Sequence, residues 1–379
     1  MKIVYVVGGL LAPNGMSSVL SAKINYLAEN TDYELYMILT EKAGHKWYYT
    51  INPKVRWVNF DINFDELDTM PLVKKIFFYL QKQRRYKKMF TDYLMKVRPD
   101  ITVSTVRREI NFINDIPDGS KKIGEIHFNK SNYRNIHVPF FPVFLNLYLS
   151  RKWMKGLVKQ IARLDCFVVL THKDAVNWKE LSNVKVIPNF ITHFPDQTSL
   201  CENKKVIAVG RYDRVKGFDM LIAAWKSVNE KYPDWYLNIY GAGDKEFYQK
   251  IANSLALKDV IHCNSSVSDI DMKYADSSLF VLSSRNEGFG LVLVEAMAAG
   301  LPVVSFDCPC GPSDIIHDGD DGILVENGNI EKMAESICWM INHPEARIQF
   351  GERARCNAMR FAQDNIMNMW QELFDSLSS

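Results

Sequence analysis

The segment 277–306 constrains the fold of this chain more than any other stretch. It begins with an apolar strand, continues through a loop that contains Gly-Phe-Gly, and ends with an apolar helix and a second strand. Such a unit is typical of an α/β fold, in which ligands sit at the glycine loop and the helix N-terminus. Two carboxylates, Glu287 and Glu295, stand eight positions apart here. A carboxylate in such a loop either contacts a hydroxylated ligand or caps the helix, and this segment alone leaves both interpretations open.

Strand and helix patterns alternate along the whole chain in two successive runs. The first run extends from the start to about residue 188, and the second begins near Val206. The polar residues 192–204 between them are typical of an interdomain linker. A chain of 379 residues is also too long for one ordinary core. We therefore predict an α/β protein with two doubly wound parallel sheets, in domains covering 1–190 and 200–360.

Composition narrows the class of protein. The chain is 47% hydrophobic and 24% charged, which is typical of a soluble globular protein. Its seven cysteines are scattered and include no CxxC pair, so the sequence favours a reducing cytosol over a disulfide framework or a structural zinc site. The first residues form a strand pattern rather than a signal peptide, and no apolar run reaches the length of a spanning helix. We expect a cytoplasmic protein.

A second cluster with ligand-binding character is the segment 210–217, Gly-Arg-Tyr-Asp-Arg-Val-Lys-Gly. Arg211 follows a strand end, and Lys216 lies just before a helix. Two cations at a strand-to-helix turn are well placed to bind a highly charged anion such as a pyrophosphate. The simpler alternative is a pair of solvated basic residues on a surface loop.

These motifs together resemble those of the retaining glycosyltransferases of family 4. The resemblance rests on the paired glutamates with their Gly-Phe-Gly loop, on the Gly-Arg…Lys-Gly turn, and on an early glycine loop that includes Gly15. The segments 307–316 and 321–325 are similar to the block that follows the paired glutamates in bacterial polysaccharide members. The family has the GT-B fold, in which two Rossmann-like domains face an interdomain cleft.

The resemblance also implies what each part of the chain does. Residues 1–190 match the acceptor-binding domain, and residues 200–360 match the domain that binds the nucleotide sugar. Residues 361–379 match a C-terminal helix that packs back on the first domain. The implied reaction moves a hexosyl unit from a nucleotide sugar, with UDP as the expected nucleotide, to a hydroxyl of a growing glycan. Retention of anomeric configuration is implied, and the expected acceptor is a lipid-linked oligosaccharide in capsule, exopolysaccharide or O-antigen synthesis.

The resemblance assigns roles to single residues, with Arg211, Lys216, Glu287 and His127 as the catalytic set. Arg211 and Lys216 match a pyrophosphate clamp, where fixed cations stabilise the charge on the leaving nucleoside diphosphate. Glu287 matches a residue that accepts hydrogen bonds from donor-sugar hydroxyls, and Glu295 matches one that holds the ribose diol. His127 matches a histidine that hydrogen-bonds the donor sugar, although a satisfied loop histidine is the simpler alternative. The remaining donor-binding residues are Gly15, Phe289, Gly290, Leu291, Gly241 and Gly243.

Three other functions fit parts of this pattern. An epimerase of the same fold needs acid and base groups at the sugar ring, and His127 is the one clear candidate. A phosphorylase needs a cofactor lysine and a longer chain. A catalytically silent partner that binds a sugar nucleotide is disfavoured by the intact set of Arg211, Lys216, Glu287 and Glu295.

Two Asp-x-Asp strings raise the question of a metal. Asp269 is better explained as the cap of a short helix, and residues 318–322 as a tight turn before a strand. We therefore expect neither a metal nor another cofactor.

Two basic stretches in the first domain suggest a further partner. Residues 72–98 carry nine basic residues and one acid on a helical pattern, and residues 151–163 carry five basic residues and no acid. Interleaved aromatics, and the aromatic run 140–149, make peripheral docking on anionic lipid a hypothesis beside the simpler alternative of a solvated helix face. No motif in the sequence indicates nucleic-acid binding.

Overall fold

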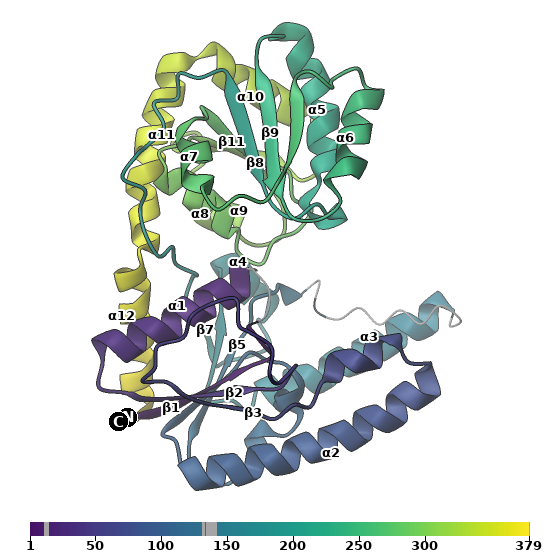
Figure 1. Ribbon diagram of the computed structural model, residues 1–379, viewed down its shortest axis with the longest axis vertical. Coiled ribbons are helices and arrows are strands. Elements are labelled where there is room, and N and C mark those ends of the chain that lie inside the picture. Colours follow the sequence, from purple (N-terminus) through teal and green to yellow (C-terminus); the bar gives the residue numbers. More distant parts are fainter. Residues whose placement is uncertain (11–14, 131–132, 134–141, 379) are drawn as a thin grey trace. The chain divides into compact units, whose positions relative to one another are not determined.

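The computed structural model describes residues 1–10, 15–130, 133 and 142–378, and it divides into two compact units (Figure 1). The N-terminal unit comprises 1–170, 175–187 and 367–379, and the C-terminal unit comprises 171–174 and 188–366. Each unit contains one parallel sheet with helices on both faces, as the alternating sequence pattern predicts. The fold class is therefore confirmed as two Rossmann-like α/β domains.

The sheet of the N-terminal unit has seven parallel strands in the order β3-β2-β1-β4-β5-β6-β7. Strand order reverses beside β1, because the chain leaves β1 toward β2 and later returns on the other side to form β4. Strands β1, β2 and β6 are mostly apolar along their length, as is typical of strands covered by helices on both faces. The strands are β1 (Lys2–Val7), β2 (Glu34–Leu39), β3 (Arg56–Asn59), β4 (Ile101–Ser104), β5 (Lys121–Glu125), β6 (Cys166–Val169) and β7 (Val184–Val186).

The helices of this unit pack on opposite faces of its sheet. Helices α2 (Leu72–Val97) and α3 (Val143–Ile161) share one core with β1 and β2, in which rings such as Tyr86 and Phe90 meet edge to face. Helix α1 (Gly15–Asn30) lies on the other face (Figure 1). Short helical segments are η1 (Phe64–Thr69), η2 (Arg108–Asn111), η3 (Ile113–Asp115) and α4 (His172–Asn177).

Helix α3 differs from the prediction. We expected a helix over 151–163, but α3 begins at Val143, so most of the aromatic run is its first two turns. The earliest residues of that run, 140 and 141, lie outside the described residues. Pro142 precedes the helix, which fits the preference of proline for positions where no intrahelical N–H is needed.

The sheet of the C-terminal unit has six parallel strands in the order β10-β9-β8-β11-β12-β13. Helices α5 and α10 share a core with this sheet, and its largest buried side chain is Trp225. The strands are β8 (Lys205–Val209), β9 (Tyr236–Gly241), β10 (Ile261–Ser265), β11 (Leu279–Leu282), β12 (Val303–Asp307) and β13 (Gly322–Glu326). The helices are α5 (Phe218–Lys231), α6 (Lys245–Ser254), α7 (Ile270–Ala275), α8 (Leu291–Ala298), α9 (Pro312–Ile315), α10 (Ile330–Asn342) and α11 (Pro344–Ala358).

The last helix, α12 (Gln363–Ser378), brings the end of the chain to the N-terminal unit from Met367 onward. Trp370 of α12 packs over the ammonium of Lys23, 3.6 Å from the ring centroid. Lys23 is fully buried in α1 and forms an ion pair with Glu125 at the end of β5. Burial alone would raise the pKa of Glu125, but Lys23 and His127 hold it at about 2. This buried ion pair therefore joins α1, β5 and α12.

Lys23→Met should lower the free energy of unfolding by about 3–5 kcal/mol, because it leaves the Glu125 carboxylate buried without its ammonium. Urea unfolding at neutral pH measures this loss. Lys88→Met, a change of the same kind on the exposed face of α2, is the matched control and should change stability little. Equal effects of the two substitutions would contradict the structural role of the pair.

Candidate functional site

The site-like turn at 213–217 is pressed against the end of strand β11. The Asp213 carboxylate accepts a hydrogen bond from the Lys216 amide at 3.1 Å and so caps the short helical turn Arg214–Lys216. Gly217 has φ 65°, and a Cβ at this position would lie 2.0 Å from the carbonyl oxygen of Ser283. Only glycine allows so close an approach of two backbones in this conformation. The turn is therefore fixed where β8 and β11 end.

Side chains after β11 complete this attachment. The Ser283 hydroxyl donates to the Lys216 carbonyl at 2.9 Å, and the Arg285 amide donates to the Val215 carbonyl at 2.7 Å. The Arg285 guanidinium binds both oxygens of Asp219, each at 2.7 Å, which holds the pKa of that carboxyl below its usual range. The roles of Arg285 and Asp219 were not predicted, and the available signal was a basic residue two positions before Glu287.

The two sequence motifs meet in one ion pair. The Lys216 ammonium lies 2.7 Å from the Glu287 carboxylate, which also accepts a hydrogen bond from the Ser284 hydroxyl at 2.6 Å. The side chains are 18% and 9% exposed, so the pair is largely shielded from water but still accessible. Glu287 is not the N-cap residue of α8, which is Gly290. Its carboxylate is bound by the Lys216 ammonium and the Ser284 hydroxyl.

Arg211 has a different environment from Lys216. Its side chain is 72% exposed, and its guanidinium lies 3.0 Å from Asp213, which also caps the turn. An ion pair this exposed contributes little to stability. Arg211 is therefore free to reorient toward an anion at the same strand-to-helix turn.

The glycine loop before α8 presents backbone rather than side chains. Gly290 has φ 100°, which places it in the left-handed region that favours glycine. The Phe289 side chain is buried and packs edge to face on Phe361, with ring centroids 5.5 Å apart. Phe289 can therefore serve a ligand only through its amide, as can Leu291, the first residue of α8. The first amides of a helix have no partner within the helix, so a helix N-terminus favours an anion or an oxygen-rich group.

Glu295 lies in the middle of α8, where it is half-buried beneath the hydroxyl of Tyr274, 3.4 Å from its carboxylate. Burial is the main cause that raises the pKa of Glu295, to about 7; the Tyr274 hydrogen bond and His193 oppose this rise, and the charge of Asp271 adds to it. Asp271 is itself paired with His193 at 2.8 Å. A half-buried carboxylate with one weak partner retains the capacity to accept hydrogen bonds from a ligand.

Gly241 and Gly243 have structural reasons to be glycine. A Cβ on Gly241 would lie 1.7 Å from the carbonyl oxygen of Gly210, and Gly243 has φ 117° beside Tyr212. These contacts bring the loops after β8 and β9 together. The role of the two glycines in donor binding stays a prediction.

The two predicted site residues of the N-terminal unit are His127 and Gly15. The His127 side chain is 3% exposed, and its Nε2 lies 3.2 Å from the Glu125 carboxylate. Gly15 begins α1, and a Cβ there would meet no described atom within 4 Å. The fold therefore does not require glycine at this position, and the predicted roles of both residues stay predictions.

The Asp-x-Asp carboxylates are occupied by neighbouring groups. Asp269 pairs with Lys273 at 3.1 Å, and Asp320 pairs with Arg353 at 2.8 Å. Asp318 accepts a hydrogen bond from the Leu324 amide in the turn before β13. Within the described residues, no group of three or more His, Cys, Asp or Glu side chains is arranged to hold a metal ion.

Comparison with known families identifies the unit that contains this ion pair. Residues 190–356 match the family described as Glycosyl transferases group 1. The match covers most of the C-terminal unit. The match contains every predicted site residue except Gly15 and His127, and it supports the resemblance drawn from the paired glutamates.

Curated relatives carry related names. The chain is 32% identical over 231 residues to an uncharacterized glycosyltransferase of Haemophilus influenzae, covering 59% of this chain and 65% of the relative. It is 30% identical over 255 residues to the poly(ribitol-phosphate) alpha-N-acetylglucosaminyltransferase of Staphylococcus aureus, covering 66% of this chain and 52% of the relative. The chain thus spans less than two thirds of the length of either relative.

Solved structures match the full length of the fold. Staphylococcus aureus TarM, crystallised as a mutant with Fondaparinux, alpha-GlcNAc-glycerol and UDP, superposes with a TM-score of 0.74 at 18% identity, covering 98% of this chain and 99% of that one. Sucrose-phosphate synthase of Thermosynechococcus elongatus gives a TM-score of 0.80 at 16% identity, covering 99% and 98%. These likenesses establish a fold shared with glycosyltransferases of the GT-B type.

The pKa of Glu295 predicts a pH-dependent stability. Because its pKa rises from 4.5 to about 7 on folding, the folded state binds a proton more tightly, and stability should fall as pH rises through this window. Glu295→Gln removes the effect, so its stability relative to the natural protein should increase between pH 5 and pH 8. Urea unfolding at both pH values measures the difference, with the exposed Glu230→Gln as control. A pH-independent difference would contradict the shifted pKa.

Proposed function

We propose that this chain is a retaining glycosyltransferase that moves a hexosyl unit from a nucleotide sugar, expected to be UDP-linked, to a hydroxyl of a glycan. The observation that carries the proposal is the Lys216–Glu287 pair, because it joins a phosphate-binding cation and a hydroxyl-binding carboxylate at 2.7 Å. The family match of residues 190–356 supports the same assignment. A donor with a pyrophosphate and a sugar next to each other would engage both groups at once.

Charge stabilisation at the leaving phosphate is the proposed source of most of the rate. Lys216 is held in place by its turn, so its ammonium needs no reorganisation when charge develops on the leaving group. Arg211 is exposed and would close on the pyrophosphate from the same turn. The amides at the start of α8 would add dipoles of the same sign. We propose that this set acts without a metal ion.

The carboxylates would position the donor rather than attack it. Glu287 would accept hydrogen bonds from sugar hydroxyls, and Glu295 would hold the ribose. Pairing with the Lys216 ammonium makes the Glu287 carboxylate a poor nucleophile, which favours displacement on the front face of the sugar. In that step the bond from the anomeric carbon to the phosphate breaks, the acceptor oxygen bonds on the same face, and its proton passes to the leaving phosphate.

The acceptor would be a bacterial glycan. Relatives named for their role include the amylovoran biosynthesis glycosyltransferase AmsD of Erwinia amylovora, 30% identical over 221 residues. We extend this class to the present chain as a proposal, with a lipid-linked oligosaccharide as the expected acceptor. An epimerase, a phosphorylase or a silent nucleotide-binding partner stays as the alternative, and sugar transfer to an added acceptor separates all three from a transferase.

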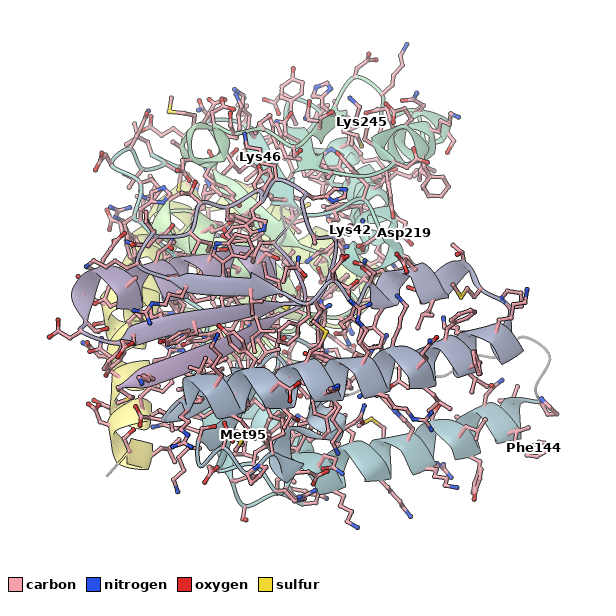
Figure 2. The ribbon with its side chains drawn as sticks, turned by 60° about the horizontal axis from the view of Figure 1, so that its bottom comes forward. Lys42, Lys46, Met95, Phe144, Asp219 and Lys245 are labelled. Atoms are coloured by element: carbon pink, nitrogen blue, oxygen red, sulfur yellow. The ribbon has the colours of Figure 1, made fainter. Side chains whose placement is uncertain are left out.

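Anionic membrane is the proposed docking surface of the N-terminal unit. The first turns of α2 expose Ile76, Phe77 and Leu80 by 50% or more, and Val143 and Phe144 of α3 are exposed by more than 70%. Phe144 stands at the outer end of α3 (Figure 2). Exposed lysines and arginines follow along both helices. Aromatics that insert among lipid headgroups, flanked by cations, fit a peripheral contact on the inner face of the cytoplasmic membrane.

No helix within the described ranges is long and apolar enough to cross a membrane.

Lys216→Ala should lower kcat by about a hundredfold or more, since it removes a fixed charge at the leaving group. Thermal stability should change far less. Release of UDP from UDP-hexoses in the presence of a glycan acceptor measures the rate, with EDTA included to test metal-free transfer. Lys226→Ala, on the exposed side of α5, is the matched control. Unchanged turnover in Lys216→Ala would overturn the clamp assignment.

Phe144→Ser should weaken binding to vesicles of phosphatidylcholine and phosphatidylglycerol, and salt should weaken binding of the natural protein. Sedimentation with the vesicles measures both effects. Phe247→Ser is the matched control, because Phe247 is 54% exposed on the C-terminal unit. Absence of salt-sensitive binding would favour a merely solvated helix face.

A further inference from the structure

A cavity of about 290 Å³ lies within the N-terminal unit, where β1, β2 and β4 end. Its lining includes Gly8 after β1, Glu41 after β2, and Arg107 and Arg108 after β4. Strand order reverses beside β1, and open parallel sheets bind ligands outside the carboxyl ends of their strands at such a switch point. All residues that line the cavity belong to the N-terminal unit, whereas Lys216 and Glu287 belong to the C-terminal unit.

Two arginines give this cavity unpaired positive charge. The Arg107 guanidinium packs against Gly8, where a Cβ would come within 2.4 Å of its Nη1. Arg108 lies over the ring of Phe64, with its guanidinium carbon 5.4 Å from the ring centroid. Neither guanidinium forms an ion pair with a carboxylate in the part of the chain that the structure describes. Paired donors of this kind suit a phosphate or carboxylate.

The loop that carries these arginines is held in a strained conformation. Val106 has φ 54°, a left-handed backbone that costs a β-branched residue on the order of 1–3 kcal/mol. The Ser104 hydroxyl accepts from the Val106 amide at 2.9 Å, and the Arg107 amide donates to Glu109 at 3.0 Å. A strained backbone persists only where surrounding contacts hold it in place, and such residues are concentrated at binding and active sites.

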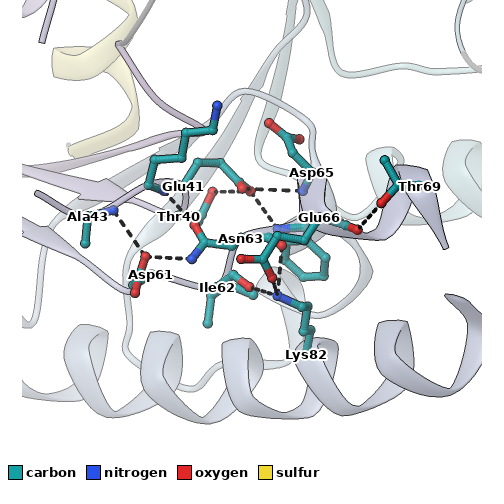
Figure 3. Close-up of polar contacts among 12 residues, drawn as sticks. Thr40, Glu41, Ala43, Asp61, Ile62, Asn63, Asp65, Glu66, Thr69 and Lys82 are labelled. Atoms are coloured by element: carbon teal, nitrogen blue, oxygen red, sulfur yellow. Dashed lines mark hydrogen bonds and ion pairs between the residues drawn. The ribbon is translucent and has the colours of Figure 1, made fainter. Parts of the chain in front are cut away.

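The acidic residues Glu109 and Glu41 of the cavity differ in how strongly their carboxylates are already hydrogen-bonded. Glu109 is buried and already accepts hydrogen bonds from Ser104, Tyr86 and the Arg107 amide. Glu41 accepts weak hydrogen bonds from the amides of Phe64 at 3.2 Å and Asp65 at 3.5 Å (Figure 3). Burial, followed by the nearby charge of Asp65, raises the pKa of Glu41. Glu41 is therefore suited to accept a hydrogen bond, or a proton, from a hydroxyl.

A lysine from α2 holds in place the segment whose amides donate to Glu41. The Lys82 ammonium donates to the carbonyls of Ile62 and Asn63 and pairs with Glu66 at 2.9 Å (Figure 3). Segment 62–66 is thereby anchored to the helix below it. The carboxylate of Glu41 and the arginines thus stand on separate, rigidly held loops.

We propose that this cavity binds the acceptor, with Arg107 and Arg108 on a phosphate ester and Glu41 on a neighbouring hydroxyl. This rests on the proposed transferase function, and it adds the chemical class of the acceptor. The shared chemistry is a hydroxylated group next to a phosphate ester. A polyol phosphate chain and a phosphate-linked lipid carrier both supply it.

Calorimetric titration with sn-glycerol 3-phosphate tests the site directly. The natural protein should bind this probe and not glycerol, and Arg107→Ala should weaken binding at least about tenfold, as expected for a lost charge-assisted hydrogen bond. Arg84→Ala, an exposed arginine on α2, is the matched control and should bind normally. Equal binding by Arg107→Ala and Arg84→Ala, or loss of binding in Lys216→Ala instead, overturns the proposal.

Transfer assays separate this proposal from the proposed function. Arg107→Ala should raise the acceptor KM and leave UDP affinity unchanged, and Arg107→Lys should recover only part of the loss because the planar fork is missing. A glycerol phosphate oligomer and a farnesyl-diphosphate-linked sugar serve as the two acceptor arms, and Arg107-dependent use of either identifies the source. If the protein uses neither acceptor but still binds UDP in a Lys216-dependent manner, the acceptor-site proposal is overturned and the transferase proposal is not. Failure of UDP, GDP and ADP alike to bind overturns the transferase function itself.

Discussion

The close contact between Gly217 and the carbonyl of Ser283 is the constraint on which the rest of the candidate site depends. A side chain at residue 217 would occupy the space of that carbonyl, so the turn and the end of β11 can meet only as backbone. Once they meet, Ser283, Arg285 and Asp213 each satisfy polar groups of the turn. The Lys216 side chain then extends from the fixed turn to Glu287, with which its ammonium pairs. A sterically enforced backbone contact thus determines an electrostatic arrangement.

Much of this organisation was predictable from the sequence, because local patterns carried it. The strand and helix periodicity predicted both sheets, and the two motifs singled out Lys216 and Glu287 as site residues without predicting that they pair. The ion pair of Glu287 could not be predicted from its own segment, because its partner Lys216 lies 71 positions away. Arg285 and Asp219 could not be predicted, since their pairing requires knowing that two loops end side by side. The start of α3 was missed because its first turns are apolar on an exposed surface, which reverses the usual pattern.

The cavity of the N-terminal unit has no comparable signal in the sequence. Glu41, Arg107 and Gly8 lie on three loops, and none of them belongs to a spaced motif. Strand order brings these loops together, because β2 and β4 flank β1 on opposite sides. Each unit thus places cations at the carboxyl ends of its central strands, in one case through a recognisable motif and in the other through topology alone. The resemblance to known families covers the first case and leaves the second to the geometry.

The left-handed backbone at Val106 affects the entropy that the loop would lose when a ligand binds. A flexible loop loses conformational entropy when it closes on a bound group, and that loss weakens affinity. Folding has already restricted this loop, because its Val106 and Arg107 amides donate hydrogen bonds to Ser104 and Glu109. The cavity is therefore preorganised, and its selectivity would come from shape and charge that exist before any ligand arrives. The loop has no alternative conformation in which it could bind a ligand of a different shape.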